Sequence, residues 1–129
     1  MPETSELIAR ARAAAEGSYS PYSGFRVGAA VRSADGTIIA SANIENASYP
    51  VSQCAEANAV NFAVSQGHRV LPEVAVACID ADSVDDAYPC GRCRQIMSEF
   101  RVETIHVTTA EGEIRTHTLD ELLPHRFTL

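Results

Sequence analysis

The sequence predicts an α/β domain in which helices cover the faces of a mixed β-sheet. Helical and strand patterns follow one another in the order α-β-β-α-β-α-β-β, which is typical of helices packed on a sheet. Asp35-Gly36 joins the first two strands and is a strong signal for an antiparallel hairpin. The continuous apolar run at residues 74–79 predicts a strand covered on both faces. At 129 residues, the chain is expected to form a single domain, residues 1–129.

The N-terminal part of the sequence predicts a helix, a loop and the hairpin. Residues 4–16 begin with hydroxyl residues that can cap a helix, are rich in alanine and precede a glycine that can end it. Residues 18–24 are polar, aromatic and broken by proline, which is typical of a loop. Residues 25–33 and 37–42 are the two predicted hairpin strands. The small residues at 28–30 predict close packing of the first strand under a helix.

The middle of the chain holds a polar segment and a second helix. Residues 43–52 are irregular and polar, as binding loops often are. Residues 53–66 predict a helix that is apolar nearly all round, so we expect it to be central and buried. The remaining elements are expected as a strand at 73–80, an acidic loop at 81–89, a helix at 91–100, strands at 104–109 and 114–118, a short helix at 119–123 and a tail at 124–129.

Composition and charge exclude several classes of function. A net charge of -7 argues against nucleic acid and anionic membrane surfaces as partners. The basic residues are all arginine, so no lysine can form a Schiff base. Residues 1–12 lack the apolar run of a secretory signal, and no stretch approaches the roughly 20 apolar residues of a membrane span. We therefore expect a cytoplasmic protein that does not enter a membrane.

Two short stretches, Cys54-Ala55-Glu56 and Cys90-Gly91-Arg92-Cys93, carry the residues most suited to chemistry. Each lies where a predicted helix begins, and a helix N-terminus stabilises thiolates. Three thiolates can hold Zn²⁺ and leave its fourth position open, as catalytic zinc sites do. Glu56 is then free to move protons at that position. The fourth cysteine, Cys78, lies in an apolar strand and is expected to be buried without a chemical role.

A C-x-x-C pair alone is also compatible with a redox pair, a structural zinc site or chance. A redox pair would leave the thiol and carboxylate at residues 54–56 unexplained. A closed structural site needs a fourth Cys or His ligand. The histidines at 68, 106, 117 and 125 have no ligand spacing to the cysteines and are expected at the surface or behind the ligands.

The charge of such a site must be offset. Three thiolates with one Zn²⁺ carry a formal charge of -1, which weakens the metal as a Lewis acid. A working site therefore needs a cation or N–H donors directed at the sulfurs. Arg92, between two of the cysteines, is the main candidate for this compensating charge, and Arg94 is the second.

A thiol-x-carboxylate at one helix start, followed by a Pro-Cys-x-x-Cys stretch at the next, is the signature of zinc-dependent deaminases. Further motifs extend the resemblance over nearly the whole chain. They lie, in order, at residues 19–30, 43–47, 49–50, 89–95 and 122–127. The sequence therefore resembles the small homotetrameric zinc-dependent cytidine deaminases.

This resemblance implies a three-layer α/β/α fold with a five-stranded mixed sheet. It also implies hydrolysis of cytidine and 2′-deoxycytidine to uridine and 2′-deoxyuridine, with release of ammonia, in pyrimidine salvage. Cys54, Cys90 and Cys93 match the ligands of one Zn²⁺ per subunit, and Glu56 matches the residue that shuttles protons.

The resemblance further assigns a substrate-binding set, namely Phe25, Asn43, Glu45, Ala55, Ala47, Tyr49 and Phe127. Asn43 and Glu45 match the ribose-binding pair, Phe25 the residue that packs on the base, and Ala55 the one whose backbone meets the pyrimidine edge. Ala47, Tyr49 and Phe127 match residues that complete the site of a neighbouring subunit in a homotetramer. Without the resemblance, these residues would be interpreted as core, loop and surface residues.

The sequence departs from the family pattern beside the zinc ligands. Relatives commonly carry Arg at the position of Ala57 and a small residue at the position of Arg92. We interpret this as a transfer of the compensating charge from one helix to the other. Blasticidin S deaminases share the Arg between the paired cysteines and are the alternative enzyme class. A non-catalytic zinc fold used for assembly is the alternative outside enzymes, and Glu56 distinguishes it, because a structural site does not need the carboxylate.

Overall fold

The computed structural model describes residues 2–129 and contains the helices and strands that the sequence predicts. In chain order the elements are α1 (Pro2–Ala15), β1 (Val27–Arg32), β2 (Ile38–Ala42), η1 (Tyr49–Val51), α2 (Ala55–Ser65), β3 (Glu73–Cys78), η2 (Val84–Asp86), α3 (Gly91–Glu99), β4 (Thr104–Thr108), β5 (Ile114–Thr118) and α4 (Leu119–Leu122). Each predicted boundary lies within about two residues of the observed one, the usual uncertainty of helix ends. The 3₁₀ helices η1 and η2 lie in segments predicted as loops.

The strands form one mixed sheet in the order β2-β1-β3-β4-β5. β3 and β4 are parallel, and the other neighbouring strands are antiparallel. A parallel pair needs a crossover connection, which here contains α3. β3 lies in the middle of the sheet and is buried along almost its whole length, which confirms the prediction from its apolar run.

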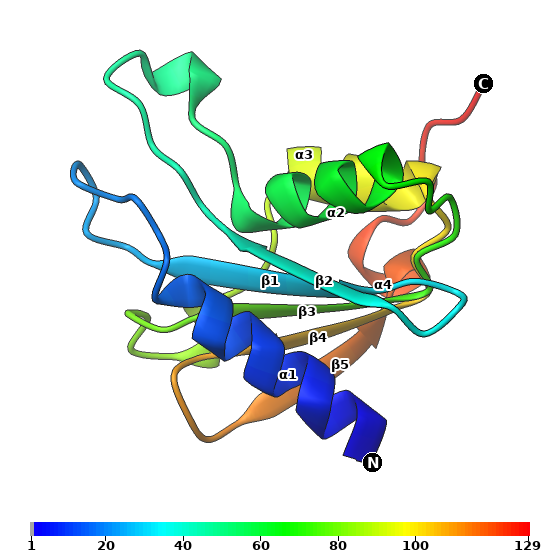
Figure 1. The fold of residues 1–129 in the computed structure, drawn as a ribbon, viewed down its shortest axis with the longest axis horizontal. Coiled ribbons are helices and arrows are strands. Elements are labelled where there is room, and N and C mark those ends of the chain that lie inside the picture. The colour runs from blue at the N-terminus through cyan, green and yellow to red at the C-terminus, as the bar shows by residue number, and fades with distance from the viewer. Residues whose placement is uncertain (1) are drawn as a thin grey trace.

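Helices cover both faces of the sheet, which confirms the expected three-layer arrangement. Figure 1 shows α1 on one face and α2 with α3 on the other. The α1 side of the core consists of Leu7, Ile8, Ala11, Ala30, Ala75 and Ala77. The larger core on the opposite face includes Val31, Val60, Val74, Val76, Met97, Ile105 and Val107.

Gly28 brings α1 and the sheet into close contact, as the run of small residues predicted. A Cβ atom at this position would lie 2.0 Å from the carbonyl oxygen of Ala11 and 2.5 Å from the nitrogen of Ala15. Neither is a distance that packed atoms tolerate. The helix can therefore lie this close to β1 only because residue 28 has no side chain.

The prediction that α2 is buried all round is wrong for its second half. Ala55, Glu56, Ala57, Ala59 and Val60 are buried under the sheet and α3. Phe62, however, is 55% exposed, and Asn61 and Ser65 are exposed beside it. The sheet covers only one side of the helix, so the opposite side of its last turns faces solvent in the single chain.

His106 is neither at the surface nor behind the cysteines, so the prediction for this histidine is wrong. It lies on β4 opposite Ala75, on the face that α1 covers. It is buried, with Nε2 2.6 Å from a carboxylate oxygen of Glu73 and Nδ1 2.8 Å from the hydroxyl of Thr116.

Across residues 2–129, the structure contains no helix with both the length and the apolar character that crossing a membrane requires.

Candidate active site

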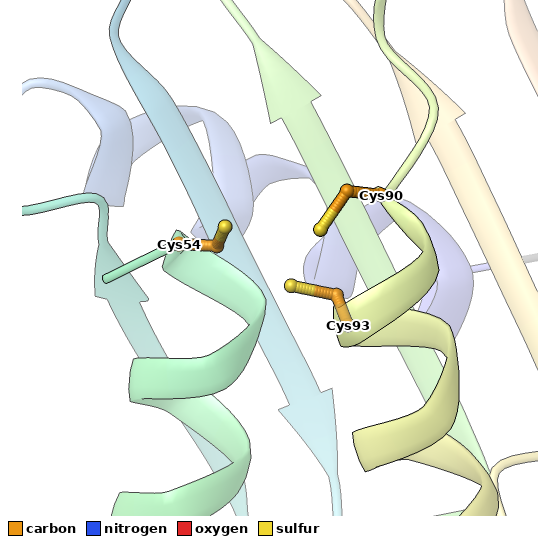
Figure 2. A group of neighbouring side chains, drawn as sticks. All are labelled: Cys54, Cys90 and Cys93. Atoms are coloured by element: carbon orange, nitrogen blue, oxygen red, sulfur yellow. The ribbon is translucent and has the colours of Figure 1, made fainter. Parts of the chain in front are cut away.

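Three cysteine sulfurs meet where α2 and α3 begin. Cys54 is the N-cap residue of α2, Cys90 is the N-cap residue of α3, and Cys93 lies in the first turn of α3. Figure 2 shows the three side chains converging on the space between the two helix starts. Their Sγ atoms all lie within 4.8 Å of one another. Tetrahedral Zn–S bonds of about 2.3 Å place sulfurs about 3.8 Å apart, so small side-chain rotations would bring all three onto one ion.

The two helix starts leave these sulfurs available to a ligand. Neither Cys54 nor Cys90 makes a side-chain hydrogen bond to its own helix, although an N-cap side chain commonly does. Each sulfur lies at the positive end of a helix dipole, which favours its thiolate form.

The proximity of the sulfurs shifts the pKa values of two cysteines in opposite directions. The pKa of Cys54 falls to about 6, chiefly because the thiol of Cys93 donates a hydrogen bond to it. The same hydrogen bond, followed by burial, raises the pKa of Cys93. Both shifts follow from the closeness of the two sulfurs, and a divalent cation bound between them would hold both as thiolates. The donor set therefore fits Zn²⁺.

Glu56 places a buried carboxyl group beside the sulfur cluster. It lies in the first turn of α2, two residues after Cys54, and is only 4% exposed. Its pKa is raised to about 7, first because burial penalises the charged form and also because of the negative charge of Cys54. A carboxyl group with a pKa near neutrality can both accept and donate protons at physiological pH.

The sulfur cluster and Glu56 open onto a pocket of about 230 Å³. Its walls are formed by Phe25, Val27, Asn43, Glu45, Ser52, Gln53, Cys54, Ala55, Glu56, Val76, Cys78, Asp86, Tyr88 and Cys90. The structure thus brings Phe25, Asn43, Glu45 and Ala55 together with the predicted ligands and the predicted proton shuttle. This volume lies below the roughly 300 Å³ at the lower end of common ligand pockets, so it suits a small molecule.

Three members of the predicted substrate-binding set lie outside this pocket. Tyr49 is 70% exposed and Phe127 is 67% exposed, and Ala47 is exposed as well. In Figure 1 the loop that carries η1 projects at the upper left, whereas the C-terminus lies at the upper right. A single chain therefore does not bring these three residues to its own pocket.

Short backbone bridges connect the loops of the pocket to the first zinc-ligand candidate. Tyr19 pairs with Ile44 in a parallel bridge, and Ile44 pairs with Gln53 in an antiparallel one. Gln53 directly precedes Cys54. The loop at residues 18–24, the loop at 43–52 and the start of α2 are thus fixed relative to one another.

The amide of Asn43 is largely occupied by hydrogen bonds within the protein. Its Oδ1 accepts from the backbone N–H of Val27 at 2.9 Å and from the hydroxyl of Ser18 at 2.5 Å. Its Nδ2 donates to the carbonyl oxygen of Phe25 at 2.8 Å. One N–H of the amide is left for a ligand. Asn43 therefore lines the pocket and also holds the neighbouring backbone of the pocket wall in place through these hydrogen bonds.

Sequence reasoning missed Asp86 and Tyr88 as pocket residues. Asp86 ends η2, and the Tyr88 hydroxyl lies 2.8 Å from Nε2 of His117 on β5. Both precede Cys90 by a few residues, and a loop that leads from a strand into a ligand-bearing helix start is a usual place for pocket residues. This position was the signal that could have identified them.

Cys78 is buried, as predicted, but it also borders the pocket. Burial, followed by the charge of Glu56, raises its pKa to about 12. Its Sγ donates to the carbonyl oxygen of Ala87 at 3.6 Å. It is therefore a neutral thiol in the pocket wall.

The two arginines beside the paired cysteines have different contacts. Arg92 donates to the side chain of Gln53 at 3.1 Å, and its charge helps to lower the pKa of Cys54. Arg94 instead donates to the carbonyl oxygens of Pro89 and Leu122, at 2.9 and 2.7 Å. Ala57, on α2, is fully buried and supplies no charge. Arg94 thus ties α3 to its surroundings, and of the two predicted candidates only Arg92 carries a charge that acts on a cysteine of the cluster.

Comparisons with known proteins agree with this chemistry. The family model for the cytidine and deoxycytidylate deaminase zinc-binding region matches residues 1–109. The chain is 45% identical over 124 residues to a cytidine deaminase from Halalkalibacterium halodurans, with 95% of this chain and 92% of the relative covered. It is 41% identical over 127 residues to a cytidine deaminase from Sporosarcina psychrophila, with 97% and 91% covered.

Solved structures and a more distant relative complete the comparison. The fold is similar to the crystal structure of a cytidine deaminase from Burkholderia pseudomallei, with a TM-score of 0.87, 37% identity and coverage of 95% of this chain and 98% of that chain. A blasticidin-S deaminase from Bacillus cereus is 36% identical over 107 residues, covering 79% of this chain and 76% of the relative.

Proposed function

The chain belongs to the cytidine and deoxycytidylate deaminase zinc-binding family, and on this premise we propose that it hydrolyses cytidine and 2′-deoxycytidine to uridine and 2′-deoxyuridine, with release of ammonia. The observation that carries this proposal is the position of Glu56, a buried carboxyl group with a pKa near 7 beside three convergent sulfurs in a small pocket. A structural zinc site has no use for such a group.

Cys54, Cys90 and Cys93 are the proposed ligands of one Zn²⁺ per subunit. Their mutual distances and their positions at two helix N-termini suit a divalent cation. When bound, Zn²⁺ supplies Lewis-acid activation of water.

Glu56 is the proposed proton carrier of the reaction. Water adds its oxygen to C4 of the pyrimidine, and Glu56 transfers the proton that the water loses to ring N3. Glu56 then takes the proton of the new C4 hydroxyl and passes it to N4, and the C4–N4 bond breaks as the C4 carbonyl forms, so that the amine leaves as ammonia. The pKa of about 7 lets Glu56 act as base and as acid in successive steps without a second residue.

Other residues of the pocket are suited to the rest of a nucleoside. Phe25 offers an aromatic face for the base, and Ala55 offers its backbone to the pyrimidine edge. Glu45 and the remaining N–H of Asn43 can bind sugar hydroxyls. A carboxylate at this place disfavours a 5′-phosphate, so nucleosides and not nucleotides are the proposed substrates.

Arg92 is the proposed compensating charge for the thiolates. This role is tested by Arg92→Ala, which should lower both zinc content and turnover. Arg92→Lys is the control, because it keeps the positive charge. Metal content is measured by atomic absorption on purified protein. Unchanged zinc content and turnover in Arg92→Ala would rule out the role.

Ala47, Tyr49 and Phe127 are proposed to complete the sites of neighbouring subunits in a homotetramer. Their exposure in the single chain leaves them available for such contacts. Light scattering coupled to gel filtration gives the subunit number, and a monomer with full activity would refute shared sites.

We also propose a cytoplasmic location, since a reducing compartment keeps the ligand thiols from forming disulfides.

Blasticidin S is the second candidate substrate, favoured by the relative from Bacillus cereus and by the arginine between the paired cysteines. Ammonia release measured against cytidine, 2′-deoxycytidine, CMP, free cytosine and blasticidin S separates the candidates. We expect turnover of the first two. Turnover of CMP but not of cytidine would refute the assigned role of Glu45, and turnover of blasticidin S alone would favour the second candidate.

A further inference from the structure

The loop at residues 18–24 contains a serine whose hydroxyl connects two residues of the substrate pocket. The Oγ of Ser23 accepts a hydrogen bond from the backbone N–H of Phe25 at 3.0 Å. The same hydroxyl donates to Oε2 of Glu45. Ser23 lies 22 residues from Glu45 in the chain and forms no part of the pocket lining itself, within the described residues.

The backbone of the loop also holds the Glu45 carboxylate. Oε1 accepts from the backbone N–H of Tyr22 at 3.0 Å and from the backbone N–H of Ser23 at 3.1 Å. Gly24, with a φ of +68°, adopts the left-handed conformation that turns the chain after Ser23. The loop tip therefore wraps around a single carboxylate.

This arrangement limits how Glu45 can bind a ligand. A carboxylate has about four lone-pair positions. Both positions on Oε1 are taken by backbone N–H groups and one on Oε2 by the Ser23 hydroxyl, which leaves one position on Oε2 for a sugar hydroxyl. The N–H of Phe25 occupies a lone pair of the Ser23 oxygen, so the hydroxyl hydrogen is directed to Glu45. The hydrogen bond from Ser23 also lowers the pKa of Glu45, which keeps it in the ionised, acceptor-only form.

We propose that Ser23 is a positioning residue for nucleoside binding, which orients the remaining acceptor position of Glu45 toward the sugar. Its side chain contacts Glu45 and the backbone of Phe25, and its proposed effect on the sugar is exerted through Glu45. This inference rests on the proposed function, and in particular on Glu45 as a ribose ligand.

The test compares Ser23→Ala, Ser23→Thr and the control Ser20→Ala in the zinc-loaded enzyme. Ser23→Ala should raise KM for cytidine about threefold to tenfold, the range for losing one ordinary hydrogen bond, because this pair is exposed to solvent, and change kcat less than about twofold. Ser23→Thr retains a hydroxyl and should restore the KM. Ser20 lies in the same loop, but its hydroxyl bonds only to that of Ser18 among the described side chains, so Ser20→Ala should match the wild type.

Two further measurements separate positioning from a general loosening of the loop. For 2′,3′-dideoxycytidine, which lacks the sugar diol, the Ser23→Ala effect on KM should disappear. In the Glu45→Gln background, Ser23→Ala should add less than about twofold. An equal KM increase for both nucleosides, or full additivity with Glu45→Gln, would overturn the proposal, as would an unchanged KM in Ser23→Ala. Wild-type protein that turns over no cytidine would overturn the proposed function itself. Normal wild-type turnover, together with an unchanged KM in Ser23→Ala, would overturn only this inference.

Discussion

Replacing Asn43 with alanine should destabilise the protein as well as weaken nucleoside binding. The substitution removes three side-chain hydrogen bonds, with Ser18, Val27 and Phe25, at distances of 2.5 to 2.9 Å. Each such bond contributes about 1 kcal/mol net, so the free energy of unfolding should fall by about 3 kcal/mol. The loss should not be much smaller, because the N–H of Val27 and the carbonyl of Phe25 lie where β1 begins and are only partly accessible to water.

The measurement is urea unfolding at fixed protein concentration, because association of subunits would make the midpoint concentration-dependent. Glu45→Gln is the matched control: its partners Tyr22 and Ser23 are exposed, so it should lower the free energy of unfolding by less than about 1 kcal/mol while raising KM. A loss below about 1 kcal/mol in Asn43→Ala, together with a raised KM, would refute the structural role and leave Asn43 as a ribose ligand alone.

Two further predictions concern stability. Gly28→Ala should lower the free energy of unfolding by about 3 kcal/mol, because its Cβ would lie 2.0 Å from the carbonyl oxygen of Ala11. Gly17→Ala, whose Cβ would lie 3.4 Å from its nearest neighbour, is the control, and equal stability of the two variants in thermal unfolding would contradict the close packing of α1. Asp80 has its pKa lowered from 3.8 to about 2, chiefly by hydrogen bonds from the guanidinium of Arg26. Since the folded-state pKa is the lower one, its stabilising contribution is present above pH 3.8 and is lost as the pH falls toward 2. Arg26→Ala should therefore be less stable than the wild type at pH 6, with a difference that shrinks by pH 2; a pH-independent difference in urea midpoint would count against this pairing.

The zinc-ligand candidates could be predicted because their signal is local. Cys54 and Cys90 each stand directly before a helix, and Cys93 follows one turn later. The chemistry of three thiols, and the position of the helix starts, can both be inferred from a few consecutive residues. Convergence of the two helix starts on one point depends on the fold, and the resemblance to a known family supplied that step.

The pocket wall could not be predicted in the same way. Tyr88 reaches the wall beside a histidine 29 residues away, and the hydroxyl of Ser23 meets a carboxylate 22 residues away. Contacts of this kind depend on how strands and loops pack, so they cannot be predicted from the spacing of residues in the sequence. The hydrogen bonds of Asn43 are a similar case, because the sequence shows an amide in a polar loop but not its partners.

Two wrong predictions have the same origin. The composition of α2 suggested burial on every side, yet burial also requires neighbours, and Phe62 has none over most of its surface in the single chain. His106 was expected near the surface or the ligands, but the parallel register of β3 and β4 places it beside Ala75, within 2.6 Å of Glu73. The pairing of β3 with β4 places the histidine there, and this pairing cannot be inferred from the residues next to it in the sequence.

The most direct test of the proposed mechanism is a paired measurement of zinc content and cytidine turnover in Glu56→Gln. Because Glu56 is not a ligand and Gln has nearly the same volume, zinc should remain near one ion per subunit and the fold should be unchanged. Because Gln cannot carry a proton in either half of the reaction, kcat should fall by about 10⁴-fold. Turnover within about tenfold of the wild type, with zinc retained, would contradict the role of Glu56 and with it the assignment of this pocket as the site of deamination.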